Sequence, residues 1–163
     1  MSSKLYLAGT GSRKSEIKHH DRPLSDFIKK YKKENPDAEI VLALNKKSDL
    51  LGQLKKLSRN VKVIFDASQK VLSVCDLAVV ASGTATLEAS ILAKPMVVIY
   101  KSNFLSNFIL SNFFLKTKFI ALPNILSQEK IIFELRQSQV IGEQIYEKVI
   151  LSLKNKKNIS EKL

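Results

Sequence analysis

The sequence is poor in the residues that constrain a chain most strongly: it has one cysteine, no tryptophan, five glycines and four prolines. A single cysteine cannot form a disulfide within the chain, which excludes the class of small disulfide-rich extracellular domains. Because Cys75 lies in an apolar segment, we expect a buried free thiol in a cytoplasmic protein. No motif indicates a metal site or a cofactor, and we expect neither.

Long apolar runs and linkers are also absent. No run reaches the roughly 18 residues of a membrane-spanning helix, and the apolar stretch near the N-terminus is too short for a signal peptide. The 163 residues show no internal repeat and no segment rich in proline, glycine or serine, so they suit one domain with a real core. We expect that domain over residues 1–153, followed by a basic, flexible tail over residues 154–163.

Acidic residues are few: 15 aspartates and glutamates stand against 27 lysines and arginines, giving a formal net charge of +12. Such a balance favours an anionic partner, such as a phosphorylated substrate, a nucleic acid or an anionic membrane surface. Arginine, the usual reader of base edges, is rare among these cations, so we expect no nucleic-acid partner.

Short apolar segments alternate with helical patterns along the chain. We expect strands at residues 5–8, 39–44, 61–65, 77–80, 96–100 and 119–121. We expect helices at residues 24–33, 50–57, 67–74, 84–93 and 103–115, and through the rest of the chain from residue 122. Nearly continuous apolar strands that alternate with helices indicate an α/β fold, a Rossmann-like parallel sheet with helices on both faces.

Two turns that follow expected strands carry suitable chemistry for a ligand, because parallel sheets bind ligands at the carboxyl ends of their strands. The first is GTGSR at residues 9–13, in which the glycines let a ligand approach the backbone and Arg13 can bind a phosphate. The alternative is an ordinary glycine turn with a solvated arginine. The GTGSR turn does not match the glycine fingerprint of dinucleotide-binding proteins, since Lys14 stands where the third glycine would be.

The second turn is ASGTATLEASILAKP at residues 81–95. Ser82, Gly83 and Thr84 stand at the expected helix start, where backbone N–H groups favour an anion. Glu88 lies one helical turn further and can accept hydrogen bonds from sugar hydroxyls. A sugar next to a diphosphate satisfies both, whereas the alternative is a helix start with an acidic residue in its favourable first turns.

These motifs together resemble a family. GSRKSEI at 11–17, the segment from Ala81 to Lys101, KT at 116–117, LPN at 122–124 and ELRQ at 134–137 look like the second half of lipid A disaccharide synthase. The resemblance spans about residues 5–149. It implies the C-terminal, donor-binding domain of an inverting GT-B glycosyltransferase, which transfers diacylglucosamine from UDP-2,3-diacylglucosamine to 2,3-diacylglucosamine 1-phosphate.

The resemblance also implies a donor site. In it the turn from Ser82 would hold the diphosphate, Glu88 would bind the ribose, and Arg13 would stabilise the departing diphosphate. Asn124 and Gln137 would complete the pocket, and Tyr100 would line it unless it is simply a core residue. The implied substrate-binding residues are Gly11, Ser12, Arg13, Ser82, Gly83, Thr84, Ala85, Thr86, Glu88, Tyr100, Asn124 and Gln137.

Two departures from the family pattern matter. Gly9-Thr10 replaces the usual Leu-Pro before the GSR motif. The family's N-terminal half, which supplies the acceptor site and the acid–base residue, has no counterpart in these residues. His19 and His20 are expected on the exposed side of their helix and are no evident general base. We therefore expect this chain to be inactive alone and to need the N-terminal half, for example as a separate polypeptide. The alternatives are a stand-alone nucleotide-binding module and part of another transferase or epimerase that uses UDP-N-acetylglucosamine.

The phenylalanine-rich segment at residues 103–115 lies between Lys101 and Lys116. We favour a helix that is buried against the sheet or against the other half. The alternative is a helix in a membrane interface, with the protein peripheral on the cytoplasmic face of the inner membrane.

Overall fold

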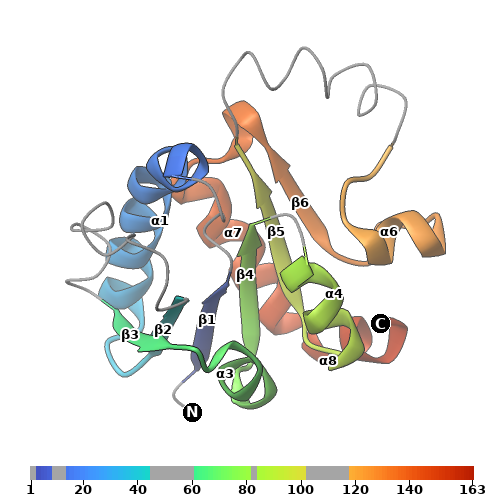
Figure 1. Ribbon diagram of the computed structural model, residues 1–163, viewed down its shortest axis with the longest axis horizontal. Helices are drawn as coiled ribbons and strands as arrows, with labels where there is room; N and C mark the ends of the chain where they lie inside the picture. The colour runs from blue at the N-terminus through green and yellow to red at the C-terminus, as the bar shows by residue number, and fades with distance from the viewer. Residues whose placement is uncertain (1–2, 9–13, 45–60, 82–83, 102–117) are drawn as a thin grey trace.

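The computed structural model describes residues 3–8, 14–44, 61–81, 84–101 and 118–163. They form a six-stranded sheet with the order β3-β2-β1-β4-β5-β6 (Figure 1), in which every pair of neighbours is parallel. The strands are β1 (Lys4–Ala8), β2 (Glu39–Leu44), β3 (Lys62–Phe65), β4 (Leu77–Ala81), β5 (Met96–Tyr100) and β6 (Phe133–Arg136). This strand order confirms the predicted Rossmann-like α/β fold.

The central strands form because their residues are apolar on both faces. All five residues of β4, LAVVA, are buried, and only Tyr100 of β5, MVVIY, is partly exposed. Strands of this kind need cover on both sides, since each face of the sheet would otherwise leave apolar surface in water.

Two helices cover one face of the sheet. They are α1 (Lys14–Glu34) and α7 (Gly142–Lys154), which pack against each other. Phe27 and Tyr31 of α1 join Ile145 and Val149 of α7 in one buried apolar cluster with the inward residues of the strands. The cluster is tight at Gly142, where an added Cβ would lie 2.7 Å from the Cβ of Asp26. The first residue of α7 therefore has to be small.

The other face is covered by shorter helices. These are α3 (Ser68–Val74), α4 (Thr84–Ile91), α6 (Leu122–Ser127) and α8 (Lys156–Lys162). Leu72 of α3, Ala89 of α4 and Ile159 of α8 belong to the second buried cluster, and α6 packs against α4.

Helix α1 is longer than predicted and passes through Pro23. The expectation that both histidines are exposed is wrong for His20, which is 3% exposed, whereas His19 is half-buried. His20 precedes Leu24 by four residues and therefore lies on the same inward stripe as Leu24, Phe27 and Tyr31.

The C-terminal third differs most from the prediction. Residues 119–121 are not a strand; the sixth strand is β6, and a short 3-10 helix, η1 (Gln137–Gln139), follows it. The alternation of apolar and polar residues in β6, FELR, extends over only four residues, which is too short to distinguish a strand from a helix. Pairing with β5 stabilises them as a strand.

Residues 154–163 were expected to be a flexible tail, but the structure forms α8 there. Ile159 is 6% exposed and packs in the second cluster together with the half-buried Leu163. One isoleucine in a lysine-rich segment was too weak a signal for a docked helix. The predicted helices at 50–57 and 103–115 lie outside the described residues. No helix within the described ranges is long and apolar enough to cross a membrane.

Candidate functional site

The candidate site lies at the carboxyl edge of the sheet, where the strand order reverses. β1 and β4 are central neighbours, with Ala8 opposite Val80, and successive strands continue outward from them in opposite directions. Such a switch point is where open α/β sheets bind ligands, because the connections on its two sides diverge to opposite faces. α1 begins at Lys14 after β1, and α4 begins at Thr84 after β4, so both predicted turns belong to this edge. The turn residues Gly11, Ser12, Arg13, Ser82 and Gly83 lie outside the described residues.

The start of α4 presents its side chains in two directions. Thr86 is 3% exposed and lies on the inner side of the helix with Ala89, which is fully buried. Ala85 and Glu88 are half-buried. Residues two apart on a helix point to opposite sides, so Glu88 and Thr86 cannot face the same ligand. Burial of Thr86 therefore favours a packing role for this residue, whereas Glu88 remains accessible.

The charge of Glu88 also affects the pKa of Tyr6 in the central strand β1. Burial raises the pKa of the Tyr6 phenol in β1, a hydrogen bond with Ser68 lowers it, and the charge of Glu88 raises it again. Tyr6 and Ala89 of α4 belong to the same buried cluster, so α4 and its Glu88 lie over the face of the sheet that carries Tyr6.

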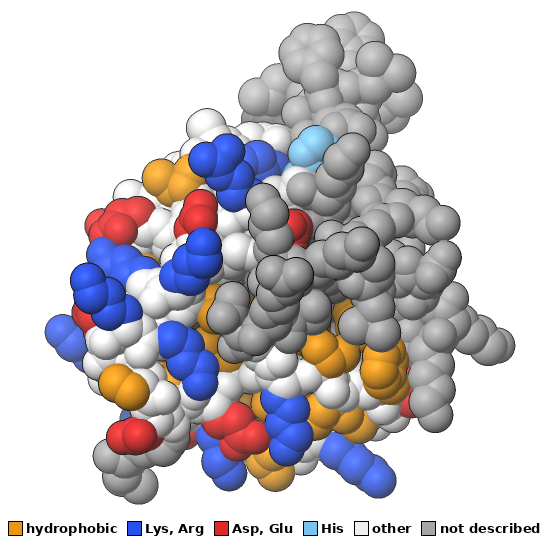
Figure 2. All heavy atoms as spheres, turned by 90° about the vertical axis from the view of Figure 1, so that its left-hand side faces the viewer, with side chains coloured by type: hydrophobic (Ala, Val, Ile, Leu, Met, Phe, Trp, Pro, Cys, Tyr) orange, Lys and Arg blue, Asp and Glu red, His pale blue; other side chains and the backbone are white. Residues whose placement is uncertain are grey.

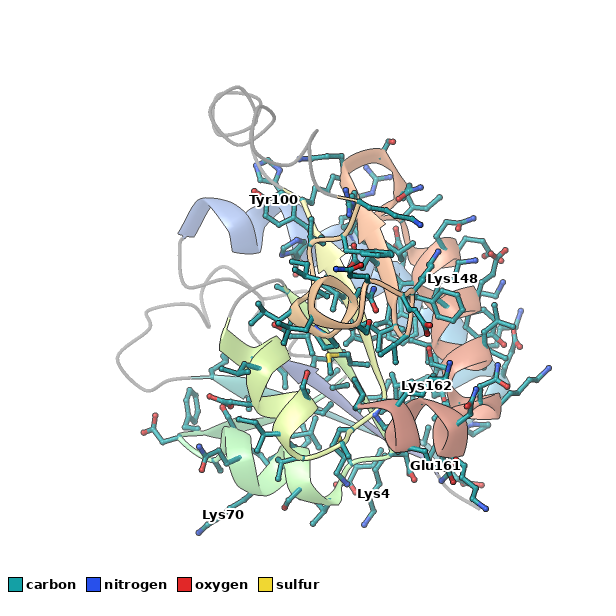
Figure 3. The ribbon with its side chains drawn as sticks, turned by 90° about the vertical axis from the view of Figure 1, so that its right-hand side faces the viewer. Lys4, Lys70, Tyr100, Lys148, Glu161 and Lys162 are labelled. Atoms are coloured by element: carbon teal, nitrogen blue, oxygen red, sulfur yellow. The ribbon has the colours of Figure 1, made fainter. Side chains whose placement is uncertain are left out.

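Tyr100 and Gln137 stand at the ends of the next two strands. Tyr100 is half-buried and pairs in register with Arg136, directly before Gln137. Gln137 has a positive φ of 48° and begins η1, which turns the chain sharply at this edge. Figure 3 shows Tyr100 at one end of the molecule and Lys4 and Lys70 toward the other. The structure thus brings Tyr100 and Gln137 to the same edge as the start of α4.

Asn124, which the resemblance implies as part of the donor pocket, makes its side-chain hydrogen bonds within the chain. Its side chain is fully buried, and its amide nitrogen donates to the Ile132 carbonyl and to Glu134 Oε1, both at 2.9 Å. Its amide oxygen accepts from the backbone N–H groups of Ile131 and Ile132 at 2.8 and 3.0 Å. Both donors and both lone pairs of the amide are used, so none is left for a ligand. In this structure Asn124 holds the segment between α6 and β6 in place.

Glu134 is the partner that sequence reasoning missed. Its side chain is 6% exposed and accepts from the backbone N–H groups of Ile120 and Ala121, each at 2.9 Å. It also accepts from Asn124 and from Arg136 Nη2, the latter at 2.9 Å. A buried carboxylate is tolerable because four donors compensate its desolvation. Glu134, the first residue of the ELRQ motif, is thereby joined to Asn124 of the LPN motif.

Arg136 closes the same network toward the surface. Its Nη2 also donates to the Lys118 carbonyl at 2.9 Å, and its side chain is 32% exposed. Glu134 and Arg136 therefore tie the segment before α6 to the end of β6, beside Tyr100. Among the described residues, no group of three or more histidine, cysteine or acidic side chains could hold a metal ion.

The face formed by α1 carries charges of both signs (Figure 2). Lys30 pairs with Glu143 at 2.6 Å, and Arg22 lies 4.0 Å from Asp26. The basic excess of the chain is therefore partly compensated on this face.

Comparison with known proteins places the chain in a family. The model of the family described as lipid-A-disaccharide synthetase matches residues 3–163. A lipid-A-disaccharide synthase of Nitrosococcus oceani is 38% identical over 149 residues, which cover 90% of this chain and 38% of that protein. The lipid-A-disaccharide synthase of Vibrio campbellii is 33% identical over 144 residues, covering 85% of this chain and 38% of that protein.

Solved structures share the fold at much lower identity. A UDP-GlcNAc 2-epimerase from Neisseria meningitidis bound to UDP-GlcNAc superposes with a TM-score of 0.64 at 17% identity, covering 99% of this chain and 39% of that chain. The spinosyn rhamnosyltransferase SpnG superposes with a TM-score of 0.62 at 16% identity, covering 99% of this chain and 41% of that chain. A transferase and an epimerase match equally well, so the fold alone does not separate these activities.

The chain spans well under half the length of the curated relatives that it matches. Nearly all of its residues nevertheless fit one family model, and the resemblance noticed in its motifs is confirmed. The chain belongs to the lipid-A-disaccharide synthetase family.

Proposed function

We propose that this chain is the donor-binding part of a lipid-A-disaccharide synthase and that it binds UDP-2,3-diacylglucosamine. The family match over residues 3–163 carries the proposal. The position of two predicted turns at the switch point of the sheet supports it, because a nucleotide-sugar bound there would meet the start of α4. The epimerase alternative is weaker, since only the fold and not the family favours it.

In the proposed site the diphosphate of the donor meets the turn from Ser82 to Thr84 and Arg13, and the ribose meets Glu88. Tyr100 and Gln137 border the sugar from the ends of β5 and β6. Asn124 acts indirectly, because its saturated amide positions the chain before β6. The hydrogen bonds of Glu134 tie the segment before α6 to β6 at this border of the proposed site.

The proposed reaction is glycosyl transfer with inversion. The acceptor hydroxyl attacks the anomeric carbon of the donor while the bond from that carbon to the diphosphate oxygen breaks. The hydroxyl proton passes to a general base, and UDP leaves with its added negative charge near Arg13. We propose that the base and the acceptor site come from a part of the enzyme outside these residues, since the relatives are much longer. That part would also provide any peripheral contact with the membrane.

Calorimetry with UDP and UMP tests the diphosphate assignment. We expect the chain to bind UDP about tenfold more tightly than UMP, because a second phosphate adds charge-assisted hydrogen bonds. Arg13→Gln should remove most of this difference, whereas Arg22→Gln on α1, whose side chain is 91% exposed, should preserve it. Equal affinities of the unaltered chain for UDP and UMP would refute the assignment.

A further inference from the structure

A pocket lies at the amino edge of the sheet, at the opposite ends of the strands from the candidate donor site. Its volume is about 450 Å³, and its walls include Asp76, Leu92, Lys94, Pro95, Lys156 and Lys157. Asp76 directly precedes β4, Lys94 and Pro95 directly precede β5, and the other two lysines begin α8. The register keeps these strand starts together, since the N–H of Ala78 donates to the Pro95 carbonyl at 3.0 Å. We call it the amino-edge pocket.

The backbone before β5 fixes the position of Lys94. Ala93 has a positive φ of 47°, and the N–H of Lys94 donates to the Ala89 carbonyl at 2.9 Å, closing the end of α4. An alanine in this left-handed conformation costs about 1 kcal/mol, which the closed helix end offsets. The Lys94 ammonium then donates to the Cys75 carbonyl at 3.2 Å on the far wall. This cation is held at the pocket before any ligand arrives.

The charges around the amino-edge pocket do not balance. Among the described residues of its wall, Asp76 is the single carboxylate, and both of its oxygens accept hydrogen bonds. One accepts from the backbone N–H of Lys4 at 2.9 Å, and the other accepts from the Lys156 ammonium at 3.2 Å. No carboxylate in the described part of the chain lies within ion-pair distance of Lys94 or Lys157. Three ammonium groups against one carboxylate leave two positive charges uncompensated.

We propose that the amino-edge pocket binds a phosphate group, either of a soluble phosphate ester or of a lipid headgroup. Two uncompensated ammonium groups match the double charge of a phosphate monoester better than the single charge of a carboxylate. Leu92 and Pro95 add apolar wall beside the cations, which suits an ester with a carbon skeleton better than inorganic phosphate. This site is separate from the donor site and does not depend on the proposed function.

NMR titration of the full chain with glycerol 2-phosphate at low ionic strength tests the proposal. We expect amide shifts at Asp76, Lys94 and Lys157. The double variant Lys94→Gln/Lys157→Gln should weaken this binding about fivefold or more. The matched variant Lys29→Gln/Lys33→Gln removes the same charge from exposed positions of α1, on the other face of the sheet, and should change it less than twofold.

A flotation assay separates the two sources of phosphate. If the ligand is a headgroup, the unaltered chain should float with vesicles of phosphatidylcholine and phosphatidic acid, and the Lys94→Gln/Lys157→Gln variant should float with them much less. If the ligand is a soluble ester, only glycerol 2-phosphate should show this dependence.

Three results would overturn the proposal: no binding of either probe, equal weakening by the control variant, or shifts confined to residues of the carboxyl edge such as Ala85 and Tyr100. UDP binding by the Lys94→Gln/Lys157→Gln variant reports on the donor site independently. A failure of the amino-edge pocket is thereby distinguishable from a failure of the proposed function.

Discussion

Glu88 is the described residue of the candidate site whose proposed role is most specific. It is half-buried on α4, on the side of the helix opposite to the buried Thr86, and after burial its charge is a further cause of the raised pKa of Tyr6 in β1. These observations agree with a carboxylate that accepts hydrogen bonds from a ribose over the switch point.

We expect Glu88→Gln to weaken UDP binding about tenfold, because hydrogen bonds to a charged acceptor contribute more than those to a neutral one. Binding of 2′,3′-dideoxy-UDP, which lacks the two hydroxyls, should not change. Calorimetry with both ligands measures this, and Glu161→Gln on α8 removes the same charge elsewhere as a control. Equal losses for both ligands would show instead that Glu88 has a structural role.

Cys75 illustrates how burial changes the chemistry of a residue. The prediction of a buried free thiol is confirmed, since Cys75 is unpaired and 5% exposed. Burial raises the pKa of its thiol to about 11. The thiol donates to the Leu72 carbonyl at 3.2 Å and packs as a small apolar side chain.

We expect Cys75 in the native chain to react with a thiol reagent at pH 8 at least about a hundredfold more slowly than in the unfolded chain, because only the thiolate is nucleophilic. The raised pKa also means that folding favours the protonated thiol. Its contribution to stability is therefore present below about pH 8.5 and is lost as the pH rises toward 11. Labelling followed with and without denaturant measures the first effect. Rapid labelling of the native chain would contradict the burial.

At the scale of elements, the connection from α6 to β6 depends on one saturated amide and one saturated carboxylate. Asn124 and Glu134 make most of the hydrogen bonds that tie the start of α6 and the segment before it to β6, and Arg136 adds one to the Lys118 carbonyl. Removing one partner would leave buried backbone N–H groups without acceptors, which costs more than the net energy of the bonds.

We expect Asn124→Ala to lower the free energy of unfolding by about 2–4 kcal/mol, because buried groups of Ile131, Ile132 and Glu134 lose their partner. Asn124→Asp should be at least as harmful, since it puts a second carboxylate where the amide nitrogen now lies 2.9 Å from Glu134. Ser138→Ala at an exposed position should change stability little. Urea unfolding measures these values. An Asn124→Ala chain of unchanged stability that no longer binds UDP would show that Asn124 contacts the donor.

At the scale of the whole molecule, the described residues form a six-stranded sheet with helices on both faces, but the chain matches only 38% of each of these relatives. A sheet of this kind can hold a donor. Transfer also needs an oriented acceptor and a general base. Positioning of the acceptor and transfer of its proton contribute many orders of magnitude to the rate.

We expect this chain alone to form no disaccharide from UDP-2,3-diacylglucosamine and 2,3-diacylglucosamine 1-phosphate. Adding a polypeptide that corresponds to the unmatched part of the Nitrosococcus oceani relative should restore turnover, and Arg13→Ala should then abolish most of it. Product formation measured by mass spectrometry decides between these outcomes. Synthesis by the isolated chain would place the catalytic groups within these residues. No turnover with any such polypeptide would favour the stand-alone binding module.

Strong local patterns were sufficient to predict much of this molecule. The runs LAVVA and MVVIY are apolar on both faces, so they had to be central strands of a covered parallel sheet, and β5 begins and ends where the sequence predicts. The order of motifs was likewise enough to identify the family, because each motif lies at a fixed place along the chain.

Tertiary contacts decided what weak local patterns left open. The sequence of β6 is too short to distinguish a strand from a helix, and its pairing with β5 makes it a strand. The sequence of α8 is mostly polar, and the packing of Ile159 in the second cluster is what docks this helix. Asn124 appeared to be a ligand-binding residue in its motif, but its hydrogen bonds go to residues seven to ten positions later in the chain. Hydrogen bonds and burial depend on which segments meet in space, and a pattern of neighbouring residues does not contain that information.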